Sequence, residues 1–538
     1  MKYVIRNGKI YDGTGSPGYL GDIFVENGKI RKIWKKEKPD EKTESNIEAQ
    51  VIEAKGKVVT PGFIDTHRHC DLAALYDDNF GELEVAQGLT SVMGGNCGLG
   101  IFPSTKEHSE EMYDFIEPCL GIGKKETIIS DYSQYRTILK SRELPLHVGC
   151  YQGLGAIKAT IKGYGKTPFT SREMEQAKTY LKEAMEAGCL GITSGIMYQP
   201  ECYSTKEEMT ELLSAVSPYQ RPLSCHIRGE GDNLVASVGE IIEICRDAQV
   251  PLNISHFKAT GIKNWGKNIY KAIELIENAR SNGQDVSVDF YPYCGGSTTL
   301  ISLVPPDIME EDMSLTFRKM QTTKGKIELK DSLYKDHPGW DNMVTAIGWE
   351  RILISSVTKN ENRELIGLDF QKAARKRGID EPAYLMADLL AEESGKVGII
   401  VLSMSQDDVD TVAKLPYSMV ISDGLYGASD CPHPRLYGSF PHFLQDYVVK
   451  RKIFTLEHAV QKMTSMSAKR LGLMDRGVLK EGYFADMNIF SVESFQDHAV
   501  YGDSRKLSTG LSYMLVDGKL AVKEGIRQKG YTATLLSK

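Results

Sequence analysis

The sequence predicts an α/β protein in which a parallel (β/α)8 TIM barrel carries a small β-sandwich domain formed by both chain ends. The first 60 residues are short apolar runs separated by Asn-Gly and Lys-Gly turns, which is typical of β-hairpins. The end of the chain repeats this pattern in RGVLKEGYFADMNIF and YMLVDGKLAVKEG. Between the two ends, short strands alternate with helical stretches such as residues 171–187 and 233–248, which is the pattern of βα units.

The predicted boundaries follow from these patterns. We expect residues 1–59 and 476–538 to form the small β-sandwich domain, and residues 60–475 to form the catalytic barrel. The stretch from about residue 296 to 349 is long, polar and irregular, and it fits poorly into a βα unit. Because long connections in compact domains tend to be functional or mobile, we interpret this stretch as an insertion or lid.

Composition indicates an ordinary globular enzyme. With 538 residues, 41% of them apolar and 25% charged, the chain can bury a large core. The net charge of −7 provides no basic surface for nucleic acid or an anionic membrane. The start has no apolar stretch suited to a signal peptide, and no run of 18 apolar residues occurs, so we expect a cytoplasmic protein. Ten cysteines without paired spacing indicate buried thiols rather than a disulfide framework.

Two histidines one residue apart end the apolar run VVTPGFIDTHRHCD at residues 58–71. In a strand, alternate side chains share a face, so His67 and His69 point the same way, about 7 Å apart at ~3.3 Å per residue. A single histidine is more often a hydrogen-bonded structural residue than a ligand. A pair with this spacing instead favours a metal site.

Four further strand ends supply candidate ligands. The segments are PLSCHIRGE, PLNISHFK, LTSVMGGNCG and YSMVISDG, and the candidates in them are His226, His256, Cys97 and Asp423. In a parallel barrel, the C-terminal strand ends meet at the face that carries the active site. A thiolate together with imidazoles favours zinc, while spacing alone leaves iron, manganese and cobalt open.

Longer segments around these ligands carry a family resemblance. PGFIDTHRHCDL, GGNCG, GITSGIMYQPECYSTKEE, SCHIRGEGD, ISHFKATGIKNWGK, DFYPYCGGSTTL and HPRLYGSF span nearly the whole chain. Together with the ligand order, they resemble the N-acyl-D-amino-acid deacylases (D-aminoacylases) of the amidohydrolase superfamily. Many members of that superfamily bridge two metals with a carbamylated lysine, but residues 190–198 of the fourth predicted barrel strand contain no lysine. The resemblance assigns this role to Cys97.

The resemblance implies a zinc-dependent hydrolase that converts small N-acyl-D-amino acids to a carboxylate and a free D-amino acid. One tight zinc would be held by Cys97, His226 and His256, and a weaker second site by the remaining ligands, His67, His69 and Asp423. Asp423 is the candidate general base, which takes the proton of the attacking water and returns it to the amide nitrogen. Asp-Gly alone is only a turn signal; its position at the end of the last barrel strand favours the catalytic role.

Strand alternation and the resemblance nominate substrate contacts. Lys258 and Tyr291 resemble the residues that bind the substrate α-carboxylate, and Tyr198 resembles the tyrosine that stabilises the oxyanion. Arg228 either contacts substrate or forms an internal ion pair with Glu230 or Asp232. His433, which lies between two prolines, is expected to be structural.

Two other function classes stay open. A cyclic-amide hydrolase of the hydantoinase or dihydroorotase kind has the same barrel and histidines but usually carries the bridging lysine. A non-catalytic scaffold would be expected to lose ligands. Within the preferred class, residues 291–317 contain no arginine or lysine, so we expect neutral substrates to be preferred over N-acyl-D-glutamate and N-acyl-D-aspartate. Arg318 or Arg435 could supply the missing cation.

Overall fold

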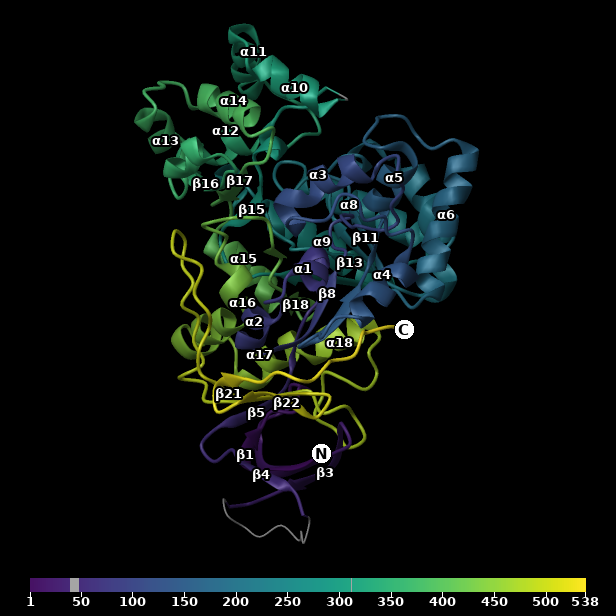
Figure 1. Ribbon diagram of the computed structural model, residues 1–538, viewed down its shortest axis with the longest axis vertical. Coiled ribbons are helices and arrows are strands. Elements are labelled where there is room, and N and C mark those ends of the chain that lie inside the picture. Colours follow the sequence, from purple (N-terminus) through teal and green to yellow (C-terminus); the bar gives the residue numbers. More distant parts are fainter. Residues whose placement is uncertain (39–47, 311) are drawn as a thin grey trace.

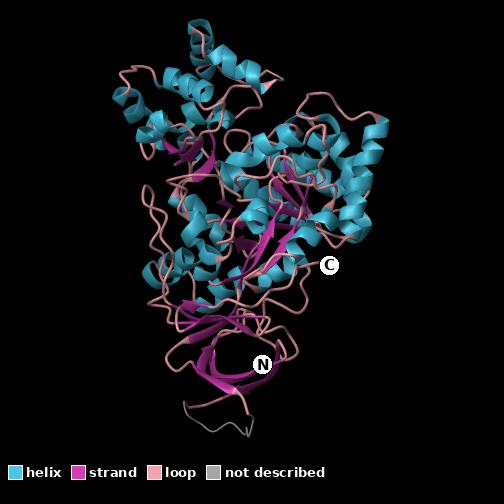
Figure 2. Ribbon diagram, viewed as in Figure 1, coloured by secondary structure: helices cyan, strands magenta, loops and turns pink. Residues whose placement is uncertain are grey.

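The computed structural model describes residues 1–38, 48–310 and 312–538, and it contains three parts stacked along the long axis of the molecule (Figure 1). A β-sheet of both chain ends lies at the bottom of the view, a barrel lies in the middle, and a mainly helical insertion lies at the top (Figures 1 and 2). Among the described residues, no helix combines the length and apolar character needed to cross a lipid bilayer.

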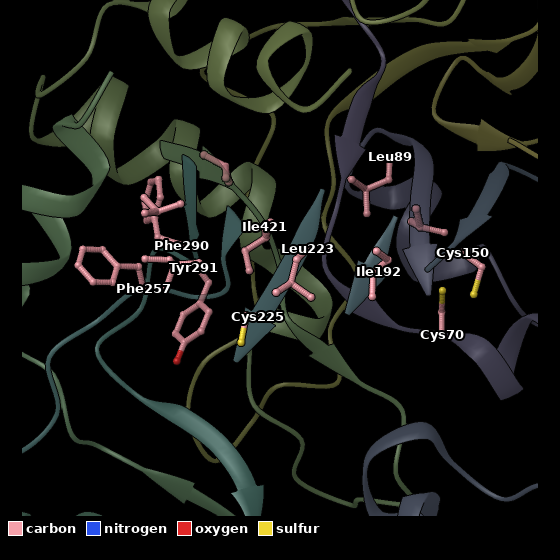
Figure 3. Close-up of a cluster of buried hydrophobic side chains, with 14 of the residues drawn as sticks. Cys70, Leu89, Cys150, Ile192, Leu223, Cys225, Phe257, Phe290, Tyr291 and Ile421 are labelled. Carbon is pink, nitrogen blue, oxygen red and sulfur yellow. The ribbon is translucent and has the colours of Figure 1, made fainter. Parts of the chain in front are cut away.

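Eight parallel strands form the barrel, which confirms the predicted fold class. They are β6 (Phe63–Asp65), β8 (Leu89–Gly94), β9 (His147–Cys150), β11 (Ile192–Gly195), β12 (Leu223–His226), β13 (Leu252–Ile254), β14 (Val286–Phe290) and β18 (Ser418–Val420). The ring is closed by the short parallel pair β7 (Arg68–His69) and β19 (Gly424–Leu425). Leu89, Ile192, Leu223 and Ile421 contribute to its buried core (Figure 3).

Helices follow the barrel strands in sequence. They are α1 (Asp71–Tyr76), α2 (Glu82–Ala86), α3 (Ser109–Leu120), α4 (Tyr132–Lys140), α5 (Leu154–Lys162), α6 (Ser171–Glu186), α7 (Lys206–Ser214), α8 (Leu234–Ala248), α9 (Asn268–Ser281), α15 (Gln406–Lys414), α16 (Arg435–Phe443), α17 (Leu456–Met463) and α18 (Ser465–Leu471). Helix α6 shows why the expected helices form. Its first turn carries a capping box between Thr170 and Glu173, and it buries Met174, Ala177 and Leu181 at helical spacing.

The two chain ends share one nine-stranded sheet. Its strands are β1 (Lys2–Ile10), β2 (Tyr19–Glu26), β3 (Lys29–Lys35), β4 (Gln50–Glu53), β5 (Val58–Pro61), β20 (Met487–Phe490), β21 (Leu511–Val516), β22 (Lys519–Lys523) and β23 (Ile526–Arg527). Antiparallel pairing of β5 with β20 joins the two ends. The last residues return to the barrel, where Leu536 N donates to Val148 O at 2.9 Å. The exact domain boundaries stay a prediction.

The insertion is larger and more regular than expected. Strands β15 (Gly296–Thr299), β16 (Ile352–Ser356) and β17 (Gly398–Val401) form an antiparallel sheet with its own buried cluster. Its helices are α10 (Met313–Met320), α11 (Thr323–Leu333), α12 (Met343–Ile347), α13 (Phe370–Lys376) and α14 (Pro382–Glu392). The expected limit near residue 349 and the irregular structure are therefore wrong. The pairing of β15 with β17 joins segments about 100 residues apart, and local sequence patterns do not reveal it.

Candidate active site

The six candidate ligands meet at the C-terminal ends of the barrel strands. Cys97 Sγ lies 3.3 Å from His67 Nε2, 3.9 Å from His226 Nδ1 and 3.6 Å from His256 Nε2. Asp423 Oδ1 lies 3.5 Å from His67 Nε2 and 3.3 Å from His69 Nε2. All six side chains are buried. The thiol therefore lies at the centre of the cluster and the carboxylate at one side of it.

Two overlapping groups of donors fit a metal ion. His67, His69 and Cys97 form one group, and Cys97, His226 and His256 form the other, with donor atoms within 4.8 Å of one another in each group. Cys97 belongs to both groups. One soft thiolate with several imidazole nitrogens is a donor set that suits zinc.

Three of the ligands have an unusual backbone conformation. The φ angles are 55° at Cys97, 36° at His256 and 50° at Asp423, all in the left-handed region. Such conformations cost of order 1–3 kcal/mol for residues other than glycine and occur mainly at functional sites. They lie just beyond the ends of β8, β13 and β18, so simple strand alternation does not set the direction of these side chains.

A set of charged residues holds His256 in place. Its Nδ1 lies 3.1 Å from Glu230 Oε1, and its backbone N–H donates to Asp289 Oδ1 at 2.5 Å. Lys258 Nζ pairs with the same Glu230 oxygen at 2.6 Å. Nδ1 also lies 2.8 Å from Lys258 Nζ, so both charged groups contact one side of the ring, while Nε2 on the other side faces Cys97.

Two of the three histidines near Cys97, His226 and His256, are kept in the neutral form. Burial lowers the pKa of His226 to about 4. Burial, followed by the charge of Lys258, also lowers the pKa of His256 well below its ordinary value. Neutral imidazole is the form that binds a metal ion, so both rings are ready to bind near pH 7.

Arg435 at the start of α16, which the sequence analysis named only as a possible cation for a second substrate carboxylate, lies beside the ligand cluster. Its Nη1 lies 2.8 Å from Asp423 Oδ2, and its guanidinium lies over the Tyr291 ring, 4.6 Å from the centroid. His433 Nδ1 accepts from the Arg435 backbone N–H at 3.0 Å, which agrees with the structural role expected for this histidine. Arg435 lies within the family-like segment HPRLYGSF, which was the available signal.

Arg68 lies between His67 and His69 in the sequence, and its guanidinium contacts residues outside the ligand cluster. Its guanidinium donates to Ser422 Oγ at 3.0 Å and to the Leu436 carbonyl at 2.9 Å, and it lies 3.3 Å from Asp65 Oδ2. Ser422 precedes Asp423, and Leu436 follows Arg435. One fully buried side chain therefore connects the first barrel strand to the two segments that carry the Asp423–Arg435 pair.

The proposed substrate contacts lie around this cluster. Tyr198 Oη is 3.5 Å from His226 Nδ1. The buried Tyr291 hydroxyl has no hydrogen-bond partner among the described residues. Arg228 pairs with Glu240 at 3.0 Å and donates to the Cys202 carbonyl at 2.8 Å. The expected ion pair of Arg228 with Glu230 or Asp232 is therefore wrong, because Glu240 on α8 reaches the guanidinium instead.

A cavity of about 1100 Å³ opens above the cluster. Its lining includes five of the six ligands, His69, Cys97, His226, His256 and Asp423, and also Tyr198, Arg228, Lys258, Tyr291 and Arg435. Residues of the insertion form its outer wall. Five of the six candidate ligands and every expected substrate contact therefore line one cavity.

The chain is similar to known proteins along its whole length. The model of the Amidohydrolase family matches residues 407–522. The D-aminoacylase of Alcaligenes xylosoxydans xylosoxydans is 29% identical over 96% of this chain and 93% of its own. The N-acyl-D-glutamate deacylase of the same organism is 28% identical over the same shares.

Solved structures are also similar to this chain along its whole length. The N-acyl-D-glutamate deacylase of Bordetella bronchiseptica, complexed with zinc and a phosphonate inhibitor, has a TM-score of 0.82 at 28% identity and covers 100% of this chain and 99% of its own. A D-aminoacylase with a binuclear metal centre has a TM-score of 0.82 at 27% identity with the same coverage. An L-hydantoinase of Arthrobacter aurescens, with a TM-score of 0.52 at 16% identity over 100% of this chain and 99% of its own, shares only the fold. Along its whole length, the chain therefore resembles the D-aminoacylases of the amidohydrolase superfamily.

Proposed function

We propose that this protein hydrolyses the amide bond of N-acyl-D-amino acids to give a carboxylate and a free D-amino acid. The observation that carries the proposal is the convergence of Cys97, four histidines and Asp423 at the floor of a large cavity. Full-length similarity to D-aminoacylases supports the substrate class.

Cys97, His226 and His256 would hold one tightly bound zinc ion, and His67, His69 and Asp423 would form a weaker second site. A zinc ion bound there supplies a Lewis acid that polarises the substrate carbonyl and lowers the pKa of a water molecule. Burial raises the pKa of the Cys97 thiol well above its usual range, so the free thiol is protonated. Loading the site therefore requires Cys97 to lose a proton, and zinc affinity should increase with pH.

Asp423 is suited to move the proton. Burial alone would raise the pKa of this carboxyl, but the nearby charges of Arg435 and His67 hold it well below its usual range. Asp423 is therefore ionised and able to accept the proton of the attacking water. Because Arg435 engages Oδ2, the oxygen that faces the histidines, Oδ1, is the one available to carry this proton to the amide nitrogen.

Three residues on one side of the cavity would bind the α-carboxylate. Lys258 and Arg435 carry positive charge, and Tyr291 offers an unpartnered hydroxyl whose pKa is raised by burial, so it stays a donor. Tyr198, beside His226, would donate to the developing oxyanion. Arg228 lines the same cavity, but its contacts with Glu240 and Cys202 make it a weaker candidate.

A panel of substrates tests the proposal. Protein of known zinc content would be assayed with N-acetyl and N-formyl D- and L-amino acids and with hydantoins and dihydroorotate. We expect hydrolysis of the D-compounds, little of the L-compounds and none of the cyclic amides. Turnover of the cyclic amides alone would favour the hydantoinase-like alternative, although the fourth barrel strand β11, Ile192–Gly195, lacks the lysine typical of that class. No turnover of any compound would favour a non-catalytic scaffold.

A further inference from the structure

The cavity is larger than an N-acetyl amino acid requires. Its volume is about 1100 Å³. Pockets for whole drug-sized ligands are typically about 300–1,000 Å³, and an N-acetylated amino acid is smaller than such ligands. Much of the space therefore lies beyond the reacting amide, and its walls indicate what else is bound there.

The order of strands around the barrel separates two sides of this space. The carboxylate-binding residues Lys258, Tyr291 and Arg435 follow β13, β14 and β18, which are the sixth to eighth barrel strands. In a closed ring of eight strands, the second to fourth strands lie opposite them. A substrate held by its carboxylate on one side, with its carbonyl over the ligand cluster, directs its acyl group toward the loops of β8, β9 and β11.

The barrel wall on that opposite side has an apolar part, beside the charged residues Glu111, Asp114 and Lys166. It includes Leu99 after β8, Phe115 on α3 and Met197 after β11, all of which line the cavity. Phe115 also packs on the ring of Tyr164, with centroids 4.6 Å apart. These side chains offer dispersion contacts and no charge to an acyl chain that leaves the cluster in this direction.

The insertion covers the same side of the cavity. Its Lys396 pairs with Asp114 and Glu117 of α3 at 3.1 and 2.7 Å, and β15 contacts α3. Figure 1 shows α3 next to this part of the insertion. The insertion contributes apolar lining residues here, namely Ile301, Met309 and Phe317.

The charged residue of the insertion that contacts α3 is already engaged, because Lys396 pairs with Asp114 and Glu117. Glu111, Lys166 and Arg318 also line the cavity, so the inference rests on the apolar residues that lie among these charges.

We propose that this apolar half of the cavity binds a long aliphatic acyl group, so that the preferred substrates are N-acyl-D-amino acids with medium or long acyl chains. The inference rests on the proposed function and specifies its substrate class. The acyl chain passes from the ligand cluster between α3 and the insertion, with Phe115 on one side and Phe317 on the other.

A chain-length series tests the inference. The values of kcat/KM would be compared for N-acetyl-, N-butanoyl- and N-octanoyl-D-methionine, with N-acetyl derivatives of D-alanine and D-phenylalanine to vary the other side of the amide. Burial of each CH2 favours binding about two- to fourfold, and the octanoyl group has six more CH2 groups than the acetyl group, so we expect the octanoyl compound to exceed the acetyl compound by about 60-fold or more. Octanoate should also inhibit much more strongly than acetate.

The possible outcomes separate the two proposals. Hydrolysis of N-acetyl-D-methionine with a flat or falling dependence on chain length would overturn the acyl-chain inference alone. A gain that follows the amino-acid side chain rather than the acyl chain would also overturn it. Failure of every N-acyl-D-amino acid, including the acetyl and formyl compounds, would instead overturn the proposed function.

Two variants test where the acyl chain of the substrate binds. Phe317→Glu should lower the octanoyl-to-acetyl ratio of kcat/KM by about tenfold, because it places a charge against the chain. Leu315→Glu is the matched control: Leu315 lies on the same helix, is 46% exposed and does not line the cavity, so the ratio should stay unchanged. Met309→Glu is a second cavity variant that serves if Phe317→Glu folds poorly. An unchanged ratio in a folded Phe317→Glu or Met309→Glu protein would overturn the inference.

Discussion

Arg435 and Asp423 form a buried ion pair in which Nη1 lies 2.8 Å from Oδ2. Both side chains line the cavity and neither is more than 9% exposed. Buried charges are stable when paired, so each residue keeps the other ionised. The pair fixes one carboxylate oxygen of Asp423 and leaves the other directed at His67 and His69.

Removal of this pairing should change the pH dependence of catalysis. In Arg435→Met, Asp423 loses the positive charge that contributes most to lowering its pKa. The pKa of Asp423 should therefore rise by about 1 to 3 pH units. Because the ionised carboxylate is the active form, the acidic limb of kcat/KM against pH should move upward. Arg435→Lys keeps the positive charge, so the acidic limb should move less in this variant. An acidic limb at the same pH in both variants would assign this limb to another group.

Asp423→Asn should lower kcat by about 10² to 10⁴, the usual effect of removing a general acid–base group. The zinc bound by Cys97, His226 and His256 should be retained, which elemental analysis would establish. Asp430→Asn, at a 43% exposed side chain of the same loop region, is a control that should not alter kcat. If kcat is unchanged in Asp423→Asn, proton transfer belongs to a different residue.

Cys97→Ser should lose the tight zinc and almost all activity, because a serine hydroxyl is not ionised near pH 7 and cannot replace the thiolate. Zinc content after dialysis and activity would be measured together. Cys119→Ser provides the control, since Cys119 lines the same cavity but belongs to neither donor group. Full zinc content with normal turnover in Cys97→Ser would show that the thiolate is not a required ligand.

The sequence predicted the fold class and nominated all six residues of the cluster, because these features depend on local patterns. His67 and His69 follow directly from strand alternation. Alternation does not explain Cys97, His256 and Asp423, whose left-handed backbone conformations arise beyond the strand ends. Their positions at the ends of predicted strands nominated them, and the family-like segments then suggested their roles. Their assigned roles stay predictions until the variants are measured.

Non-local contacts account for what could not be predicted. Arg228 lies two residues before Glu230, yet it pairs with Glu240, one helix further along the chain. Glu230 forms its ion pair with Lys258 instead. Likewise, β16, β17 and the helices near residues 370–392 have the local patterns of βα units, and only their pairing with β15 places them in the insertion.

Away from the active site, a buried ion pair should make stability depend on pH. Asp486 Oδ1 lies 3.1 Å from His147 Nε2, and Asp486 also pairs with Arg476. Burial raises the pKa of Asp486, but its interactions with His147 and Arg476 outweigh burial and lower it. A lowered pKa in the folded state contributes stability above the unfolded value of about 3.9, and this contribution is lost as the pH falls through the folded value.

Asp486→Asn should therefore lower the free energy of unfolding by about 3–5 kcal/mol at pH 7, the usual cost of breaking a buried pair. The difference from the native protein should shrink as the pH falls below about 5. Chemical denaturation at several pH values would measure it. Asp503→Asn, at a 61% exposed side chain, should change stability by less than about 0.5 kcal/mol. A pH-independent difference would mean that charge is not the cause.

The last prediction concerns the amino-acid side chain of the substrate, since the relatives include both a D-aminoacylase and an N-acyl-D-glutamate deacylase at nearly equal identity. Residues 296–299 and 301–304, which line the cavity after Tyr291, carry only neutral side chains. The two inner cations, Lys258 and Arg435, are already paired with Glu230 and Asp423. A second substrate carboxylate would thus have no free cation here.

Neutral N-acyl-D-amino acids should accordingly be preferred over N-acyl-D-glutamate and N-acyl-D-aspartate. A buried carboxylate without a partner costs several kcal/mol, so the difference in kcat/KM between N-acetyl-D-leucine and N-acetyl-D-glutamate could reach about a thousandfold. Arg318 also lines the cavity, but it is exposed on α10 and donates to Ser314. Equal or higher kcat/KM for N-acetyl-D-glutamate would contradict the prediction, and its loss in Arg318→Met would then identify Arg318 as the cation that reaches the second carboxylate.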